Sequence, residues 1–237
     1  MTDVSKSAPK IAGMFDAIAG RYDFLNHFLS AGIDRRWRRQ AVRSLGLTGS
    51  ERVLDLCTGT GDLAIALCTG RPGAGRVVGV DFAGAMLAVA RDKLRRRGLA
   101  DRIQIVRADA TRVPLAAVSI DAVTIAFGIR NVDDTAAACR EMARVLVPGG
   151  RLAILEFAVP SSRLFRPIYM WYFRHVLPRL GRLVSRHDMA YDYLPASVGA
   201  FAAGSDFVAV LRKAGFVEVS ARPLTFGSVV LYNARKS

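Results

Sequence analysis

Residues 52 to 64, RVLDLCTGTGDLA, constrain the fold of this chain more than any other stretch of its sequence. A short apolar run with one carboxylate, Asp55, leads into a turn that carries Gly59 and Gly61, and a helix-forming segment follows. Glycine permits the positive φ of a tight turn and lets a ligand approach the backbone. The unpaired N–H groups at a helix start attract anionic or polar groups. The stretch therefore predicts a strand, a turn and a helix that together bind a nucleotide-like ligand.

Strands and helices are predicted to alternate along the rest of the chain. The expected strands cover residues 52–56, 76–80, 103–107, 122–127 and 151–157, with helices over 62–68, 84–97 and 135–146. Continuous apolar strands separated by helices are typical of a parallel sheet that is covered on both faces. A helix over 205–214 and strands over 216–221 and 225–234 end the chain, and these two strands are near enough to pair as a hairpin. We therefore predict an α/β fold with a doubly wound, mostly parallel seven-stranded sheet.

Two other segments differ from this alternation. Residues 11–47 carry apolar side chains at helical spacing before the first strand, which predicts a helical cap. Residues 163–184 mix aromatic and aliphatic side chains with arginines, a pattern that fits an apolar lid, an interfacial helix pair or helices of the core. We expect one domain over 1–237, made of a helical cap (11–47), a cofactor-binding core (48–158), a helical insertion for substrate (160–200), and a C-terminal helix and hairpin (201–237).

The composition limits the class of protein. Of 237 residues, 51% are hydrophobic, which permits a large core and argues against global disorder. The 34 basic and 20 acidic residues give a formal net charge of +14, which fits nucleic acid, anionic lipid or an arginine-rich composition without such a partner. Cys57, Cys68 and Cys139 lack paired spacing, which disfavours a disulfide framework or a zinc site. We expect a cytoplasmic protein that holds no metal.

Polar residues follow the predicted strands where a ligand site is expected. In open α/β sheets, ligands bind beyond the carboxyl ends of the strands. The groups at these ends are 58–62, Asp81, Asp109 with Ala110, and 128–131. Asp81 follows Gly61 by 20 residues, the placement expected for a carboxylate that accepts hydrogen bonds from two ribose hydroxyls. Spacing alone fits both NAD and S-adenosylmethionine, because residues 59–64 also match a loose Gly-x-Gly-x-x-Ala pattern.

Asp55 favours S-adenosylmethionine, because Asp-x-Cys-x-Gly-x-Gly over 55–61 resembles the first motif of class I methyltransferases. In that family the strand carboxylate helps to position the loop and the amino group of the cofactor. Asp109 and Ala110 fall where the family contacts adenine, and the last helix and two strands resemble its reversed terminal hairpin. The resemblance implies a Rossmann-like methyltransferase fold. The implied cofactor residues are Gly59, Thr60, Gly61, Asp81, Asp109 and Ala110.

Four other stretches resemble the ubiquinone/menaquinone biosynthesis C-methyltransferase family. They are RYDFLNHFLS at 21–30 with Trp37 after it, FGIRNV at 127–132, RVLVPGGRLAILEF at 144–157 and AYDYLPASV at 190–198. These stretches occur in the family's order and extend over nearly the whole chain. Three positions depart from the pattern: Asp34 stands where His is usual, Val147 where Lys is usual, and Ala126 where some members have a Ser that contacts the cofactor.

The resemblance implies methyl transfer from S-adenosylmethionine to a ring carbon of a reduced, polyprenylated quinol. We expect demethylmenaquinol, while a benzoquinol stays open. The ring carbon becomes nucleophilic as its hydroxyl loses a proton, so the enzyme must align the methyl group and stabilise developing phenolate charge. Arg130 and Asn131 are the expected catalytic residues, and Tyr22 and His27 are weaker candidates. A guanidinium stays protonated, so Arg130 would stabilise the oxyanion or order a water, unless it serves as an ion-pair anchor.

A prenyl tail lies in the bilayer, so the resemblance also implies peripheral contact with the inner face of the cell membrane, through the basic and aromatic stretch 163–184.

Three alternatives remain: an RNA or other small-molecule methyltransferase, a non-catalytic nucleotide-binding or membrane-associated scaffold, and a dehydrogenase. Nucleic acid is not the expected partner. Enzymes that methylate exocyclic amines of bases usually carry Asn/Asp-Pro-Pro-aromatic after the fourth strand, whereas this chain has Phe-Gly-Ile-Arg-Asn there. The sequence leaves the tail length and the oligomeric state open.

Overall fold

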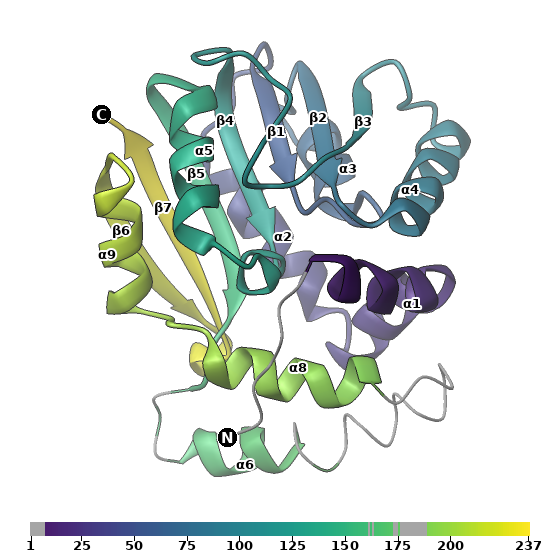
Figure 1. Cartoon of the computed structure of the whole chain (residues 1–237), viewed down its shortest axis with the longest axis vertical. Coiled ribbons are helices and arrows are strands. Elements are labelled where there is room, and N and C mark those ends of the chain that lie inside the picture. Colours follow the sequence, from purple (N-terminus) through teal and green to yellow (C-terminus); the bar gives the residue numbers. More distant parts are fainter. Residues whose placement is uncertain (1–7, 161, 163, 173–174, 176–188) are drawn as a thin grey trace.

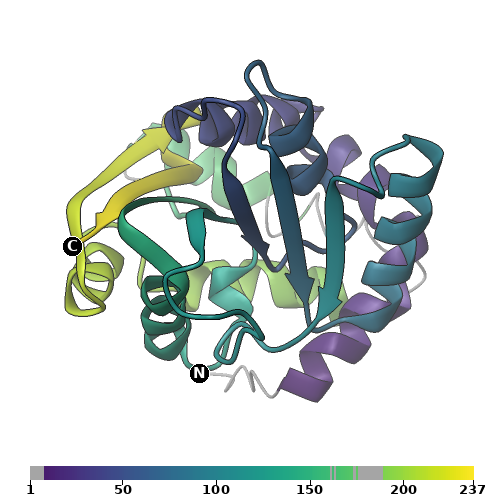
Figure 2. The ribbon, with the colours of Figure 1, turned by 90° about the horizontal axis from the view of Figure 1, so that it is seen from above.

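The computed structural model describes residues 8–160, 162, 164–172, 175 and 189–237. A seven-stranded sheet lies at its centre, with strand order β3-β2-β1-β4-β5-β7-β6 (Figures 1 and 2). The strands are β1 (Arg52–Leu56), β2 (Arg76–Asp81), β3 (Ile103–Arg107), β4 (Ile120–Ala126), β5 (Leu146–Phe157), β6 (Phe216–Leu224) and β7 (Val229–Lys236). β1 to β5 are parallel, and β7 runs antiparallel to both β5 and β6. The predicted mostly parallel sheet with a terminal hairpin is confirmed.

Helices cover both faces of the sheet (Figure 2). They are α1 (Ala8–Leu29), α2 (Ile33–Ser44), α3 (Asp62–Thr69), α4 (Gly84–Arg96), α5 (Thr135–Val145), α6 (Phe165–Trp171), α8 (Met189–Ala200) and α9 (Ser205–Lys213), with 3-10 turns η1 (Ile129–Asn131) and η3 (Thr225–Gly227). On β5, Ala153 and Leu155 join a core cluster with α2 and α3, whereas Leu152 and Ile154 join one with α5 and α9. Successive side chains thus enter opposite clusters, which explains why the central strands are apolar throughout.

Several strand boundaries differ from the sequence-based prediction, including the start of β4 at Ile120 and the end of β6 at Leu224, and the starts of β5 and β7 differ most. β5 begins at Leu146, not at residue 151, because Leu146 pairs with Ile120 and brings the expected turn at 148–150 into the strand. The strand expected from residue 225 begins instead at Val229. Thr225 and Phe226 have φ angles of 43° and 56°, which no extended strand can accommodate, and they form η3.

The predicted helical cap consists of α1 and α2, and the insertion contributes α6 and α8. Figure 1 shows α1, α6 and α8 at the end of the sheet toward which the parallel strands point. The stretch predicted at 163–184 is described only over 164–172 and residue 175, and the rest of it lies outside the described residues. In the described part of the chain, no single helix is long and apolar enough to cross a bilayer, while one pair bent by 69°, 193–200 with 205–213, meets that test in length and composition only.

Candidate functional site

A cavity of about 280 Å³ opens at the carboxyl ends of β1, β2 and β4. Strand-end loops contribute one wall and α1 the other. The loop residues include Gly59, Asp81, Asp109, Ala110, Ala126 and Asn131, and the α1 residues are Ile11, Ala12, Phe15 and Tyr22. The position matches the one at which open α/β sheets bind ligands. Four of the six cofactor residues predicted from the sequence therefore lie on a single cavity wall.

Asp81 is the anchored carboxylate of this cavity. Its Oδ2 accepts a hydrogen bond from the Gly59 backbone N–H at 2.8 Å, and its Oδ1 accepts one from the Ala83 N–H at 2.9 Å. Burial raises the pKa of Asp81, while these N–H donors lower it in part. Each carboxylate oxygen can accept further bonds, so Asp81 is fixed in place with acceptor capacity left for the hydroxyls of a ligand.

Asp109 and Ala110 lie on the same wall of the cavity as Asp81, just after the end of the neighbouring strand β3. Asp109 Oδ1 accepts hydrogen bonds from both the backbone N–H and the hydroxyl of Thr111, each at 2.8 Å. This local turn fixes the orientation of the carboxylate. Ala110 is buried beside it. The pair thus offers one polar and one apolar surface to a ligand, as a flat heterocycle with polar edges requires.

Thr60 and Gly61, also predicted to bind cofactor, do not line the cavity. The Thr60 hydroxyl donates a hydrogen bond to Asp23 on α1. Gly61, at φ 83°, precedes the first residue of α3, where a Cβ would lie 3.5 Å from that of Ala90. The structure thus gives Thr60 a role in the attachment of the turn to α1 and Gly61 a role in the packing of the turn against α4, and their contact with cofactor stays a prediction.

Asp55 lies beneath the same loop and is 1% exposed. Its Oδ2 accepts a hydrogen bond from the Thr58 hydroxyl at 2.6 Å, and its Oδ1 accepts one from the Thr124 hydroxyl at 2.8 Å. Burial raises the pKa of Asp55 to about 6, although the two hydroxyls lower it in part. Asp55 therefore holds the loop to β4 from below, the loop-positioning role that the sequence comparison implied.

A second cavity of about 150 Å³ adjoins the first, and many of the side chains in its walls are aromatic. Phe15, Tyr22 and Phe127 line both cavities. The other aromatic side chains of the second cavity are Trp37, Phe157, Tyr169, Tyr172 and Tyr193, from α2, β5, the α6 segment and α8. The rings of Phe127 and Phe157 stack at 4.5 Å between centroids. Such walls suit a flat, largely apolar ring placed next to the contents of the first cavity.

Arg130 lies on the wall of this aromatic cavity, held in a buried ion pair. Its Nη1 donates to Glu156 Oε1 at 2.8 Å and to the Phe127 carbonyl, and its Nε donates to Ser197 Oγ at 3.3 Å. The Arg130 backbone N–H also donates to Glu156 Oε2, at 3.2 Å. The geometry includes the ion pair that was one of the two roles considered from the sequence, and direct stabilisation of an oxyanion by Arg130 stays a prediction.

The positive charge of Arg130 nevertheless affects the pKa of tyrosines on the cavity wall. Burial raises the pKa of Tyr22, Tyr169 and Tyr193, and the positive charge of Arg130 lowers it in each case. These three side chains are phenols on the wall of the aromatic cavity. The negative charge of Glu156 raises the pKa of Tyr193, so a phenolate in this cavity would be stabilised where it lies nearer to Arg130 than to Glu156.

Asn131 lies where the two cavities meet. It lines the first cavity, and its Oδ1 accepts a hydrogen bond at 3.1 Å from the hydroxyl of Tyr193, which lines the second. The predicted catalytic pair is thus brought to the junction, with Arg130 on the aromatic side and Asn131 on the other. Glu156 and Tyr193 were missed from the sequence, because only the fold brings β5 and α8 to this point.

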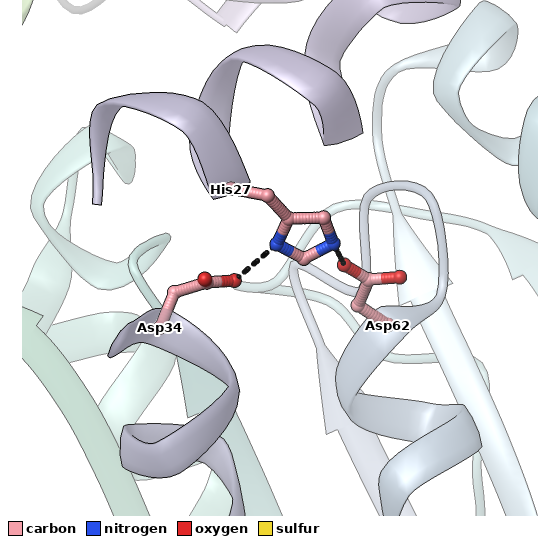
Figure 3. Close-up of side chains that lie close together, drawn as sticks. All are labelled: His27, Asp34 and Asp62. Atoms are coloured by element: carbon pink, nitrogen blue, oxygen red, sulfur yellow. Dashed lines mark hydrogen bonds and ion pairs between the residues drawn. The ribbon is translucent and has the colours of Figure 1, made fainter. Parts of the chain in front are cut away.

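His27, Asp34 and Asp62 form a polar cluster behind the loop (Figure 3). His27 Nδ1 lies 2.7 Å from Asp34 Oδ2, and His27 Nε2 lies 3.6 Å from Asp62 Oδ2. The three atoms have a spacing that could hold a metal ion. Two cations of the chain already neutralise the carboxylates, because Arg38 pairs with Asp34 and Lys93 lies 2.8 Å from Asp62 Oδ1. The cluster therefore joins α1 and α2 to the first turn of α3.

The model of the ubiE/COQ5 methyltransferase family matches residues 1–236. The Ubiquinone/menaquinone biosynthesis C-methyltransferase UbiE of Geobacter sulfurreducens is 45% identical over 236 residues, which cover 100% of this chain and 92% of that protein. The Demethylmenaquinone methyltransferase of Thermus thermophilus is 49% identical over 219 residues, which cover 92% of this chain and 98% of that protein.

Solved structures show similarity of fold at low sequence identity. The [4+2]-cyclase SpnF superposes with a TM-score of 0.72 at 17% identity, over 97% of this chain and 96% of that one. A SAM-dependent methyltransferase from Thermotoga maritima gives a TM-score of 0.65 at 20% identity, over 95% of this chain and 99% of that one. At these identities the comparison establishes the arrangement of sheet and helices alone.

Proposed function

The chain belongs to the ubiE/COQ5 methyltransferase family, and on that premise we propose that it methylates a ring carbon of demethylmenaquinol. It is an S-adenosylmethionine-dependent C-methyltransferase of quinone biosynthesis with the Rossmann-like class I fold. The demethylmenaquinone methyltransferases among its relatives support the naphthoquinol as acceptor. The polyprenyl tail, the residue roles and the cellular location given below are parts of the proposal.

One observation supports the reaction most directly: two cavities of different chemistry share a wall formed by Phe15, Tyr22 and Phe127. Methyl transfer requires donor and acceptor at near-contact distance with the attacking carbon in line. A carboxylate-lined cavity next to an aromatic one provides a place for each reactant. Because α1 covers both, reaction at their junction would be shielded from water.

The residues present fit S-adenosylmethionine. Asp81 has acceptor capacity for the ribose hydroxyls, while Asp109 and Ala110 would hold the adenine edge and face. A Cβ on Gly59 would meet no atom within 4 Å, so the turn leaves open space for the amino-acid part of the cofactor. When bound, the cofactor supplies an electrophilic methyl group on a sulfonium sulfur.

The part of this chain in the chemistry is orientation and electrostatics. The acceptor ring would stack between aromatic walls, with its hydroxyl toward the Arg130 side of the cavity. Arg130 would favour the phenolate through its fixed charge, which Glu156 and the Phe127 carbonyl hold in position. Asn131, tied to Tyr193, would hold the ring hydroxyl or the amino-acid part of the cofactor at the junction.

We also propose that the protein works in the cytoplasm as a peripheral protein on the inner face of the cell membrane. An acceptor with a prenyl tail is confined to the bilayer, and the net charge of +14 favours surfaces rich in anionic lipid.

The quinone profile of a strain that lacks this protein tests the proposed reaction. Demethylmenaquinone should accumulate, and a plasmid with the intact gene should restore menaquinone whereas Asp81→Ala should not. Accumulation of a demethylated benzoquinone would reassign the acceptor. An unchanged profile would remove the proposal.

A further inference from the structure

We propose that the outer face of α6 and the turn between β6 and β7 dock on a bilayer with anionic headgroups, and so bring the aromatic cavity to the membrane. We call the side chains Leu164, Ile168, Trp171 and Phe226 the docking face. The inference rests on the proposed function, because an acceptor with a prenyl tail must reach the cavity from the bilayer. It adds to that function a specific surface and a specific partner.

The helix α6 gives the first evidence, since its outer side is apolar and exposed. Leu164, Ile168 and Trp171 follow each other at intervals of four and three residues, which places them on one side of the helix. They are 87%, 65% and 60% exposed. Large apolar side chains gathered on one exposed surface are typical of sites that contact a membrane or another molecule.

The inner side of the same segment belongs to the aromatic cavity. Tyr169 and Tyr172 line that cavity, and the Tyr172 hydroxyl donates a hydrogen bond to the Leu29 carbonyl of α1 at 2.9 Å. Packing against the protein therefore accounts for the aromatic side chains of the inner side, but not for the large apolar side chains of the outer side. The docking face and the cavity wall are thus opposite sides of the same helical segment.

Phe226 adds an exposed aromatic ring from a different part of the chain. It is 74% exposed, and both it and Thr225 have φ in the left-handed region, at 56° and 43°. Non-glycine residues rarely adopt this conformation, and it persists where the surroundings impose it. Here the Trp37 Nε1–H donates to the Thr225 hydroxyl at 2.8 Å, and the Phe226 ring lies 5.0 Å from that of Phe165 on α6. The fold therefore holds Phe226 outward, next to α6.

The position and charge of this surface favour a bilayer as its partner. α6 and the β6–β7 turn lie at the end of the molecule opposite the C-terminus of β7 (Figure 1). Exposed arginines lie on the same or on attached elements: Arg166 on α6, and Arg35, Arg36 and Arg39 on α2, the helix that Trp37 joins to the turn. Aromatic and aliphatic side chains that insert among lipids, with basic residues against anionic headgroups, are the usual components of an interfacial membrane contact.

The test compares vesicle binding of three proteins. The docking variant carries Leu164→Gln, Ile168→Gln, Trp171→Gln and Phe226→Asn, where glutamine keeps the helix and asparagine tolerates a positive φ. The control carries Val118→Ser and Val217→Ser, which replace two exposed valines, 52% and 45% exposed, outside the docking face. Vesicles of phosphatidylcholine with or without phosphatidylglycerol are sedimented at low salt. Wild type and control should bind the anionic vesicles, and the variant should bind at least roughly tenfold more weakly. Failure of wild type to bind, or equal binding by the variant, would overturn the inference.

Methyl transfer separates this inference from the proposed function. With a demethylmenaquinol analogue whose tail is truncated to one prenyl unit, the docking variant should react within about twofold of wild type, because the cavity is intact. With the full-length acceptor in anionic vesicles, its rate should fall by about the factor lost in binding. Loss of both rates would indicate that the face supports the cavity and would overturn the docking role. A wild type inactive on both acceptors would remove the proposed function, whatever the vesicles show.

A second copy of this chain is the other occupant to consider. Sedimentation velocity without lipid would detect it. A dimer of the wild type that the docking variant abolishes, together with no vesicle binding, would replace the bilayer by a self-interface.

Discussion

Arg130 and Glu156 are ion-paired at the aromatic cavity, with 6% and 1% of their side chains exposed. Removing one member of such a pair leaves a buried charge without compensation, which costs about 3–5 kcal/mol, whereas replacing both by apolar groups is often close to neutral. A single Arg130→Ala change would therefore lower activity through stability as well as through chemistry. The two effects have to be separated before a catalytic role is assigned.

The double variant Arg130→Met with Glu156→Gln makes that separation, because glutamine removes the negative charge and keeps a carbonyl oxygen for the backbone N–H groups of Arg130 and Phe157 that donate to Glu156. We expect a free energy of unfolding near that of wild type and unchanged cofactor affinity, but kcat at least roughly tenfold lower, because no positive charge then favours the phenolate. Urea unfolding, calorimetry with the cofactor and steady-state rates measure the three quantities. Wild-type kcat in a stable double variant would show that Arg130 is an anchor only.

Asp55 allows a prediction about pH at the same scale. Its folded-state pKa of about 6 exceeds the ordinary value of 3.8, so the folded protein binds this proton more tightly than the unfolded chain does. Its contribution to stability therefore improves as the pH falls from about 8 to 5, by an amount on the order of 1 kcal/mol. The Asp55→Asn protein should lack that part of the pH dependence in urea unfolding at these two pH values. Identical pH dependence in the two proteins would contradict the raised pKa.

At the scale of elements, α1 is attached to the cofactor loops at three points along one side. Asp16 accepts a hydrogen bond from the backbone N–H of Ala85 in the first turn of α4 at 2.8 Å. Asp23 accepts a hydrogen bond from the Thr60 hydroxyl and forms an ion pair with Lys93 of α4. His27 completes the attachment through Asp34 and Asp62 (Figure 3). These contacts close the cofactor cavity from the α1 side.

Replacing His27 by Ala should loosen this attachment without harming the core. Contacts of a partly exposed histidine contribute about 0.5–1.5 kcal/mol, so KM for the cofactor should rise by roughly 2- to 10-fold with kcat little changed. Hydrogen exchange of the α1 amides should quicken by a similar factor.

His27→Asn, which can again donate to Asp34, should recover part of the loss. Arg95→Ala breaks an exposed ion pair with Asp92 on α4 and should change neither quantity. Unchanged α1 exchange in His27→Ala would contradict the attachment role.

The elements predicted correctly are those specified by local sequence. Apolar runs followed by Gly59, Asp81 and Asp109 located β1, β2 and β3 within about one residue at each end. The errors arose where distant contacts decide the structure. Leu146 belongs to β5 because Ile120 pairs with it, and Thr225 leaves the predicted strand in a turn where Trp37 hydrogen-bonds to it from 188 positions away. No local pattern carries that information.

At the scale of the whole molecule, the site too could be predicted where local sequence specifies it and not where distant contacts form it. The cofactor cavity could be predicted because strand ends of a parallel sheet meet at one edge. The aromatic cavity could not, since its walls come from α1, α2, β5, α6 and α8, which are far apart in sequence. Family resemblance pointed to Arg130 and Asn131, but the Glu156 ion-pair partner of Arg130 became visible only in three dimensions.

The three surfaces form one path through the molecule. The docking face lies outside α6, the aromatic cavity inside it, and the cofactor cavity beyond Tyr22 and Phe127. An acceptor that enters from the bilayer would therefore meet the aromatic walls before the methyl donor. In the proposed path, α6, α8 and the η3 turn would serve the entry of the acceptor, while the sheet would hold the methyl donor.

Transfer of labelled methyl from S-adenosylmethionine to demethylmenaquinol by the purified protein tests the central claim most directly. We predict labelled menaquinone that carries the methyl group on a ring carbon, identified by mass spectrometry of the fragmented product. Asp81→Ala should abolish the product at a cofactor concentration that saturates the wild type. A folded wild-type protein that binds the cofactor, as measured by calorimetry, but transfers no methyl group to the reduced acceptor would contradict the account.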